Sequence, residues 1–405
     1  MDAGMRPVAP EEIEAFVLAD GYGFGDRWVL ADHEAWARGE LDRSVGGFVD
    51  GEIVATGRNY SLELTMPGGT RLPAGGVSWV STRPTHRRQG LLREVMTALI
   101  LESRGRGEPV SVLTASEGGI YSRFGYGVAT EKVSIAVSKA TTRFREEPSI
   151  GARRLIDPQS AVEVARPLFE RLRESRPGAV SRSDAWWATE WAPRDWIDPR
   201  RRFDVVYEVD GVVEGYAMYA VDGDWDDGYT KKVVAVREML AVTPRSEHAL
   251  WHYLFNIDQT VELRAWHTPV DSMLPWLLTD GREVRTVNRR DWLWVRPIDT
   301  EMLFASRTYG ADDELVITVA DPFLELEETA GTFAVTSSMG ESTCRRTNRP
   351  PDLRLDADAL GAIILGGVAP SVLGRAGRIA GGADELLRAD GMFRTEQAPF
   401  GFTWF

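Results

Sequence analysis

A short basic segment stands out in a chain in which acidic residues outnumber basic ones. It runs from Arg83 to Arg93 with the sequence RPTHRRQGLLR, and it contains no acidic residue. A strand-like stretch precedes it and an amphipathic helical pattern follows it. The free N–H groups of a helix N-terminus bind phosphate, and a glycine such as Gly90 lets a ligand approach the backbone closely. The segment therefore favours a pyrophosphate site over a solvated basic turn.

Two tyrosines, Tyr121 and Tyr126, follow in the segment IYSRFGY. A phenol with a pKa of about 10 is well matched to protonate a thiolate that leaves during acyl transfer. From residue type alone, either tyrosine is a candidate for this general acid. The strand end at Val80, Ser81 and Thr82 would offer backbone N–H groups to a developing oxyanion.

The C-terminus is unusually apolar, since it closes on Phe400, Phe402, Trp404 and Phe405. Aromatic residues at this density are expected to be buried, whereas most chain ends fray. A buried end would hold its α-carboxylate at one specific position in the fold.

Hydrophobic periodicity predicts the elements around these residues. A helix that ends before Gly105 carries one apolar stripe, formed by Leu92, Val95, Met96, Leu99 and Ile100. We also predict a helix over residues 11–18, a loop at 21–25, and strands over 46–59, 61–66, 75–82 and 109–114. The first two strands should join at a turn. In the third, Val77 and Trp79 are expected on one face and Val80 on the other.

The middle of the chain repeats this plan. Strands are predicted over 203–207, 215–221 and 233–242, followed by a proline and an apolar helix, as in the first third. The last part has strands over 314–320 and 332–337, a helix from Asp356 and a strand-like tail. The pattern predicts a mixed α/β (α+β) protein with three parts, residues 1–145, 146–297 and 298–405, of which the second is a degenerate copy of the first.

The composition excludes several classes of protein. The chain has 405 residues, with 61 Asp and Glu against 47 Lys and Arg, for a net charge of -14. This balance argues against binding to nucleic acid or to an anionic membrane. The single cysteine, Cys344, permits no internal disulfide, and no signal peptide or membrane-spanning segment is apparent. We expect a globular cytoplasmic protein whose partners are cationic small molecules.

Several motifs resemble those of the GNAT acetyltransferases. Arg87-x-x-Gly90-x-Leu92 resembles their acetyl-CoA pyrophosphate motif, although Leu92 stands where glycine or alanine is common. More narrowly, PTHRRQGLLR, ASEGGIYSRFGYG and LPWLLTD resemble the enhanced intracellular survival (Eis-like) N-acetyltransferases, and the resemblance spans the whole chain. It implies a catalytic GNAT domain, a degenerate second GNAT domain, a sterol-carrier-like C-terminal domain and assembly into homohexamers.

The same resemblance assigns roles to individual residues. Tyr121 would be the general acid and Tyr126 a packed aromatic residue, while the α-carboxylate of Phe405 would be the general base. Asp26 and Trp36 would face the acceptor amine, the first as a cation partner and the second as a wall. The implied co-substrate, acetyl-CoA, would be bound by Val80, Ser81, Thr82, Arg88, Gln89, Gly90, Leu91, Leu92, Arg93, Ser116 and Glu117.

These observations predict an acetyl-CoA-dependent N-acetyltransferase that acts on amines of a polycationic small molecule, and the family resemblance suggests aminoglycosides. Peptide or protein lysine is the alternative acceptor. No metal is expected, because the histidine pair His248 and His252 lacks both a third ligand and the glutamate of the zinc-hydrolase pattern. A non-catalytic carrier of lipids or other hydrophobic molecules is a hypothesis of a different class, suggested by the apolar C-terminal residues Leu360, Ile363, Ile364 and Leu365. That function would leave the basic segment and Tyr121 without a use.

Overall fold

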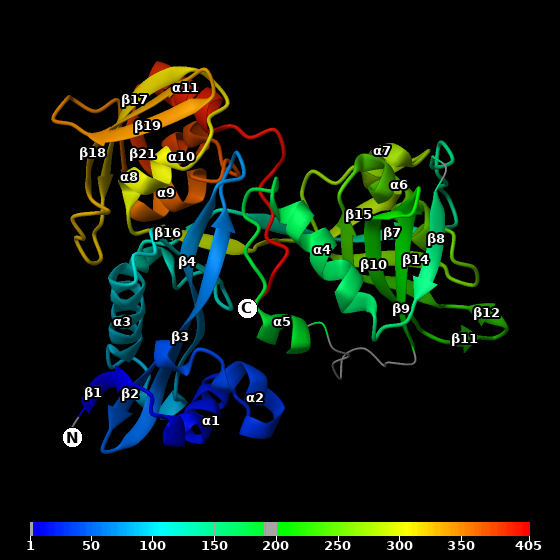
Figure 1. Cartoon of the computed structure of the whole chain (residues 1–405), viewed down its shortest axis with the longest axis horizontal. Coiled ribbons are helices and arrows are strands. Elements are labelled where there is room, and N and C mark those ends of the chain that lie inside the picture. Colours follow the sequence, from blue (N-terminus) through cyan, green and yellow to red (C-terminus); the bar gives the residue numbers. More distant parts are fainter. Residues whose placement is uncertain (1–2, 150, 190, 192–200) are drawn as a thin grey trace. The chain divides into compact units, whose positions relative to one another are not determined.

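The computed structural model describes residues 3–149, 151–189, 191 and 201–405, and Figure 1 shows the chain. Its contacts divide it into two compact units. The first unit comprises Met1–Thr130, Arg176–Thr189 and Asp291–Phe405, and the second comprises Glu131–Ser175 and Glu190–Arg290. Among the described residues, no helix combines the length and the hydrophobicity that a membrane crossing requires.

The first unit contains a seven-stranded sheet in which β4 and β5 are parallel and all other neighbouring strands are antiparallel. Its strands, in spatial order, are β1 (Ala3–Pro7), β2 (Ser44–Val49), β3 (Glu52–Thr65), β4 (Arg71–Thr82), β5 (Val110–Thr114), β16 (Leu293–Pro297) and β6 (Gly127–Val128). Helix α3 (Leu91–Gly105) connects β4 to β5 and packs on one face, whereas α1 (Ile13–Gly23) packs on the other and contacts α2 (Leu30–Arg38). Neighbouring residues of β3 show this division, because Ile53 packs against α1 and Val54 against α3.

The predicted boundary between the first two strands is wrong. The expected turn between residues 59 and 61 does not occur, because β3 continues through it and the turn lies at Asp50 and Gly51, both with positive φ. The polar Asn59 is buried in the strand, where its side chain donates to the Leu99 carbonyl at 2.8 Å. Asn59 is therefore a buried strand residue that forms a hydrogen bond inside the protein, and it does not lie in a turn.

Helix α1 extends beyond its predicted end at residue 18 and includes the first part of the predicted loop. Its last turn packs closely against its neighbours. A Cβ atom added at Gly21 would lie 2.8 Å from Trp28, and one added at Gly23 would lie 2.4 Å from the Cβ atom of Ser81. These glycines allow close packing of a helix, so the prediction of a loop here was wrong.

A β-bulge at Trp79 changes which side chains share a face of β4. The pairing with β3 shifts between Arg58–Ser78 and Thr56–Ser81, and Trp79 has a φ of 53°. The predicted alternation is therefore wrong. Val77 and Val80 both pack in the cluster around α3, whereas Trp79 packs against α1 and α2.

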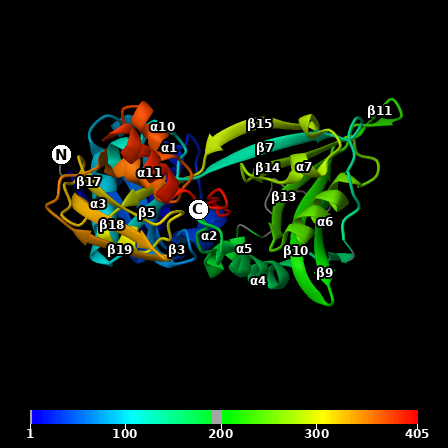
Figure 2. The same cartoon turned by 90° about the horizontal axis from the view of Figure 1, so that it is seen from above.

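The C-terminal part of the first unit has its own five-stranded sheet and four helices. The strands, in spatial order, are β19 (Glu341–Arg346), β18 (Gly331–Ser338), β17 (Asp313–Ala320), β20 (Leu353–Asp356) and β21 (Ile379–Gly381). The helices are α8 (Thr300–Ala305), α9 (Ala357–Ile363), α10 (Pro370–Arg375) and α11 (Ala383–Phe393). The tail after α11 forms no strand, contrary to expectation. The expected burial of its four aromatic side chains holds for Phe400 alone, because Phe402 and Phe405 are half-buried and Trp404 is 51% exposed. In both views this red segment ends beside the segment that leads into α5 (Asp184–Thr189) (Figure 1 and Figure 2).

The second unit repeats the sheet plan of the first. Its strands, in spatial order, are β15 (Val284–Asp291), β7 (Glu131–Ser138), β14 (Glu262–Thr268), β13 (Val233–Ala241), β10 (Val212–Asp222), β9 (Arg202–Val209) and β8 (Ala152–Ile156). Helices α4 (Ala161–Arg173), α6 (Pro244–Phe255) and α7 (Leu274–Leu277) and a hairpin of β11 (Trp225–Asp226) and β12 (Tyr229–Thr230) complete it. Because α6 links the parallel strands β13 and β14 as α3 links β4 and β5, the predicted internal repeat is confirmed.

The two sheets exchange strands. Strand β7 follows β6 in the sequence but belongs to the second sheet, where it lies beside β15 (Figure 2). Strand β16 follows β15 but lies in the first sheet, between β5 and β6. The first sheet is thus complete only with a strand from far along the chain.

Candidate active site

The turn before α3 has the backbone of an anion-binding loop. Arg88 has a φ of 65° and Gly90, the N-cap residue of α3, a φ of 88°. No side chain caps the helix, and no heavy atom lies within 4 Å of where a Gly90 Cβ would be. The exposed Gln89 lies between these two residues. The first N–H groups of α3 therefore face open space, which favours a phosphate at this end of the helix.

The neighbouring predicted residues contact parts of the same unit. Arg87 donates to the Gly23 carbonyl at 3.1 Å, and the Arg93 guanidinium lies 4.7 Å from the centre of the Phe323 ring. Leu91 and Leu92 pack in the core cluster around α3. Of this set, the exposed backbone from Arg88 to Gly90 is the part best suited to contact a ligand.

The corresponding helix of the second unit is closed by its own side chains. The Thr243 hydroxyl accepts from the backbone N–H of Ser246 at 3.2 Å, and the Ser246 hydroxyl accepts from the N–H of Thr243 at 3.2 Å. Arg245, the one arginine of this turn, forms an ion pair with Glu214. This helix N-terminus therefore lacks the open donors of α3.

The strand end at Val80, Ser81 and Thr82 extends past the last residue pair that joins β4 to β5, which is Val77 with Leu113. The two parallel strands therefore separate here. Backbone N–H groups of β4 on this side are not used by β5, so the strand end offers donors to a ligand between the two strands.

Tyr121 is 6% exposed and packs in the core cluster that includes Val77 and Leu113, the last residue pair of β4 and β5. Its ring centre is 6.4 Å from that of Trp294 on β16. Burial is the main cause that raises the pKa of the phenol, and the charges of Glu117 and Asp20 add to it, while a hydrogen bond with the exposed Ser116 acts in the opposite direction. The phenol therefore keeps its proton at neutral pH, as a general acid requires.

Tyr126 has a different environment. It is fully buried, and its hydroxyl lies 2.7 Å from the Ser111 hydroxyl. Burial raises the pKa of this phenol well above its usual range. These contacts are those of a core side chain.

The C-terminal tail is fastened along the segment Arg176–Thr189. The Arg182 guanidinium donates to the Phe402 carbonyl at 3.2 Å and stacks on the Trp186 ring at 3.9 Å. The Trp186 indole donates to the Trp404 carbonyl at 2.8 Å. No pattern in the sequence pointed to these two residues, because they lie more than 200 positions from the tail they hold.

The tail ends at the separation of β4 and β5. A terminal oxygen of Phe405 accepts from the Thr114 hydroxyl, at the end of β5, at 3.4 Å. A Cβ atom added at Gly76 of β4 would lie 3.2 Å from the Phe405 ring. The α-carboxylate thus lies beside the strand pair that also carries Val80–Thr82, in the same unit as Tyr121.

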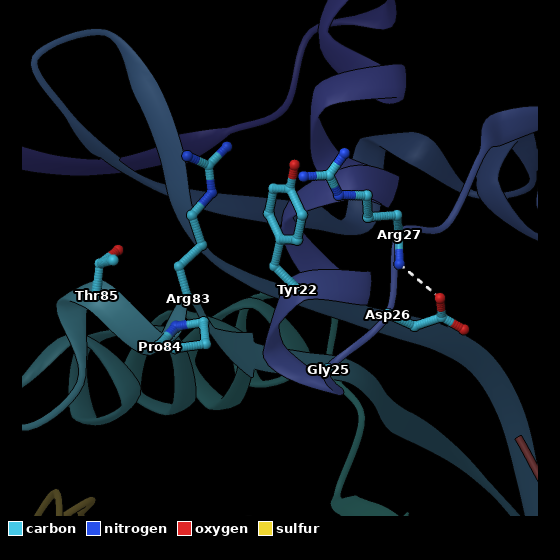
Figure 3. A pocket seen from close by; sticks show the side chains of 7 residues that line it. All are labelled: Tyr22, Gly25, Asp26, Arg27, Arg83, Pro84 and Thr85. Carbon is cyan, nitrogen blue, oxygen red and sulfur yellow. Dashed lines mark hydrogen bonds between the residues drawn. The ribbon is translucent and has the colours of Figure 1, made fainter.

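A hollow of about 630 Å³ lies between α1 and the turn after β4. It is lined by Tyr22, Gly25, Asp26, Arg27, Arg83, Pro84 and Thr85 (Figure 3). In Figure 3 the guanidinium groups of Arg27 and Arg83 flank Tyr22, whereas the Asp26 carboxylate points away from them and accepts from the Arg27 N–H at 2.7 Å. Trp36 does not line this hollow. It is buried on α2 with its ring 5.2 Å from that of Tyr60.

Asp20 is a residue that the sequence analysis missed. It lies on α1, is 1% exposed, and accepts from the Thr56 hydroxyl at 2.8 Å. Burial raises its pKa to about 6, against the effect of the Thr56 and Ser81 hydroxyls and the Arg58 charge. An apolar helix pattern gives no signal for such a residue, because burial of a single carboxyl depends on tertiary packing.

Comparison with known proteins gives the same picture for the whole chain. Acetyltransferase (GNAT) domain models match residues 4–129 and 178–297, and a sterol carrier protein domain model matches residues 300–401. An uncharacterized N-acetyltransferase of Streptomyces griseus is 34% identical over 421 residues, which cover 99% of each chain. N-acetyltransferase Eis of Mycobacterium tuberculosis is 33% identical over 347 residues, which cover 83% of this chain and 82% of that protein.

Solved structures agree. The crystal structure of Eis1 from Mycobacterium abscessus has a TM-score of 0.87 at 30% identity, with complete coverage of both chains. A GCN5-related N-acetyltransferase from Anabaena variabilis shares the fold, with a TM-score of 0.84 at 17% identity. The chain therefore belongs to the Eis-like N-acetyltransferases of the GNAT family, with two GNAT domains and a sterol-carrier-like C-terminal domain.

Proposed function

We propose that this N-acetyltransferase uses acetyl-CoA to acetylate an amine of a cationic small molecule, in a site within the first unit. The observation that carries the proposal is the hydrogen bond between a terminal oxygen of Phe405 and Thr114. It brings a carboxylate to the point where β4 and β5 separate. In this proposal, that carboxylate would be the proton acceptor of the site in which the buried phenol of Tyr121 is the acid.

The residues of the first unit fit acetyl-CoA. The open N-terminus of α3 with Arg88 and Gly90 would hold the pyrophosphate, and the exposed Ser116 and Glu117 would line the pantetheine. The backbone of Val80–Thr82 would donate to the thioester carbonyl. When bound, acetyl-CoA supplies an activated acetyl group. The capped N-terminus of α6 argues that the second unit holds none.

Tyr121 would act as the general acid. When the acceptor nitrogen attacks the thioester, the thiolate leaves and takes up a proton. A phenol whose burial raises its pKa remains protonated until that step, and it is well matched to give its proton to the thiolate.

The Phe405 carboxylate would act twice. An α-carboxyl with a pKa of about 3.5 cannot deprotonate a free ammonium without a cost of roughly 9 kcal/mol. It can hold the cation first and then accept a proton once the nitrogen has attacked, because the adduct is far more acidic. Its connection to Thr114 and the tail contacts of Arg182 and Trp186 keep the charge at one position.

A small cationic acceptor is supported by charge and by aromatic side chains. The net charge of -14 attracts cations. Aromatic rings gather on the face of β4 that α1 and α2 cover: the ring centre of Trp28 lies 6.1 Å from that of Trp79 and 4.8 Å from that of His33. The two arginines that line the hollow in Figure 3, Arg27 and Arg83, would repel a cationic acceptor. We infer that the reacting amine meets the terminal carboxylate rather than this hollow. By family resemblance, we also expect the protein to be a hexamer and to lie in the cytoplasm. Sedimentation analysis would test the number of subunits.

The test is a panel of acceptors incubated with the purified chain and radiolabelled acetyl-CoA. It contains an aminoglycoside, a linear polyamine, a monoamine and a lysine peptide, with Tyr121→Phe as the matched control protein. We expect label on the polycationic small molecules and little with the control. Label on the lysine peptide alone would favour the alternative acceptor, and no label on any amine would contradict the proposal.

A further inference from the structure

Asp20 differs from every other buried acid in the described part of the chain. Six carboxyl side chains there are buried, and five contact an arginine: Glu108, Asp204, Glu214, Asp321 and Asp358. Asp20 has no ion pair among the described residues. Arg58, whose charge acts on Asp20, donates instead to Ser44 and to the carbonyls of Trp36 and Ala37. A buried carboxyl is costly without such a partner, so Asp20 is a candidate for a function other than packing.

The hydroxyls of Thr56 and Ser81 connect Asp20 to the strand end of β4. Thr56 Oγ1 donates to Asp20 Oδ1 at 2.8 Å, and it lies 2.9 Å from Ser81 Oγ. A hydroxyl has one proton to donate. The Ser81 hydroxyl also forms a hydrogen bond with Asp20, so both hydroxyls contact the carboxyl, and either oxygen can be the donor in the contact between them. Ser81 Oγ keeps lone pairs that can accept a further hydrogen bond.

Ser81 is well placed to receive a proton from an acceptor. It is 8% exposed, and it belongs to the strand end that would contact the thioester. Asp20 and Tyr121 interact electrostatically, so the buried carboxyl lies near the proposed acid. The charged and titratable groups around the helix end that carries Asp20 are Arg58 on β3, Tyr121 after β5, His33 on α2, and Arg83 and Arg87 after β4.

The proposed reaction leaves one proton without an assigned acceptor. An ammonium nitrogen carries three protons and the amide product carries one, so the nitrogen loses two. The Phe405 carboxylate accounts for the proton lost after attack. The earlier loss, from ammonium to amine, is poorly suited to an α-carboxyl of pKa about 3.5, which lies roughly seven units below a lysine-like ammonium. Burial raises the pKa of Asp20 to about 6. That value is more than two units closer to the pKa of the ammonium than the pKa of an α-carboxyl is.

We propose that Asp20, Thr56 and Ser81 form a proton relay that deprotonates the acceptor ammonium before it attacks. This relay rests on the proposed function of the site. An N–H bond of the ammonium breaks and its proton binds Ser81 Oγ. The Ser81 proton moves to Asp20, either directly or by way of Thr56 Oγ1, which then gives its own proton to Asp20 Oδ1. The step leaves an uncharged amine and a neutral Asp20 carboxyl. The proton returns to solvent along the same path after product release. Ser81 is the group that touches the acceptor, and Asp20 is a positioning residue that acts through it.

The first test compares kcat/KM of Asp20→Asn with that of the wild type from pH 5 to pH 9, with the amine that reacts in the acceptor panel. Both proteins take the acceptor as its ammonium in this proposal, and the variant is left with the poorer base, the Phe405 carboxylate, so the ionisation of the amine cancels in the ratio of the two values. We expect Asp20→Asn to be about 10²-fold slower at pH 8, the scale of a lost general base. The two values should converge as the pH falls through 6, because the wild-type carboxyl becomes neutral there.

Control variants separate this role from a structural one. Asp32→Asn makes the same change at an exposed acid of α2 and should leave the rate unchanged at every pH. Ser81→Ala should lose as much rate as Asp20→Asn, the double variant should lose no more than either, and Ser81→Thr should recover part of the rate. Calorimetric binding of acetyl-CoA checks that each variant is folded.

Two results distinguish failure of the relay from failure of the proposed function. The relay alone would be overturned if the wild type acetylates the amine but the ratio of kcat/KM between wild type and Asp20→Asn does not change with pH. It would also be overturned if the rate losses of Asp20→Asn and Ser81→Ala add up in the double variant. No turnover of any amine by the wild type would overturn the proposed function and the relay together.

Discussion

The substitution Asp20→Asn should make the first unit more stable at pH 8 but not at pH 4. Burial raises the pKa of Asp20 from 3.8 to about 6. The folded protein therefore binds more protons than the unfolded chain between these values, so its stability falls as the pH rises through 6. Asparagine has a similar shape and does not titrate. It removes the cost of holding a charge at this position.

The size of the effect follows from the shift. Two pKa units at 1.36 kcal/mol each correspond to about 3 kcal/mol. We therefore expect the stability difference between Asp20→Asn and the wild type to increase by about 3 kcal/mol from pH 4 to pH 8. A residue whose ionised form works in catalysis is expected to lower stability in this way.

Hydrogen exchange of the α1 and β3 amides measures this difference locally, which matters because a chain with several domains need not unfold in one step. Comparing the two proteins at the same pH cancels the intrinsic pH dependence of exchange. Asp204→Asn, followed at the amides of its own strand β9, is the matched control. Its carboxyl pairs with Arg202 at 2.8 Å, so its loss should destabilise the second unit at pH 8. A stability difference for Asp20→Asn that is the same at pH 4 and pH 8 would refute the reasoning.

Three further predictions concern the proposed site. One acetyl-CoA should bind per chain, and Arg88→Glu with Gly90→Glu should abolish it; calorimetry that returns two equivalent sites would contradict the difference between α3 and α6. Tyr121→Phe should lower kcat by about 10²-fold with little change in cofactor affinity, whereas Tyr126→Phe should be mild, and steady-state kinetics in which the two effects are reversed would reassign the acid. Arg182→Ala removes the hydrogen bond and the ring stacking that hold the tail, so it should lower kcat at least about tenfold by misplacing the carboxylate; an unchanged kcat with normal acetyl-CoA binding would show that the tail needs no such support.

Local patterns in the sequence were sufficient for much of the fold. The apolar stripe of α3, the strand before it and the proline-led helix α6 are each set by neighbouring residues, so periodicity predicts both copies of the repeat. The basic turn could be predicted for the same reason, because Arg88 and Gly90 lie next to the helix that they precede.

Features that depend on distant packing could not be predicted. The bulge at Trp79 changes the faces of Val77 and Val80, and it depends on the register with β3. The continuation of α1 to Gly23 depends on close contact with Ser81. The burial of Asp20 likewise depends on packing between elements, which a pattern in one segment does not reveal.

A short Gly-Ser extension after Phe405 tests whether the terminal carboxylate acts in the reaction from the position that the tail gives it. The extension keeps every side chain but moves the charge several ångströms, and a misplacement of 1 Å can cost about 10² in rate. Phe405→Leu, which keeps a carboxylate at the same residue, should retain substantial activity. We expect the extended protein to bind acetyl-CoA normally and not to acetylate the amine. Full turnover by an extended protein whose mass confirms the added residues would contradict this expectation.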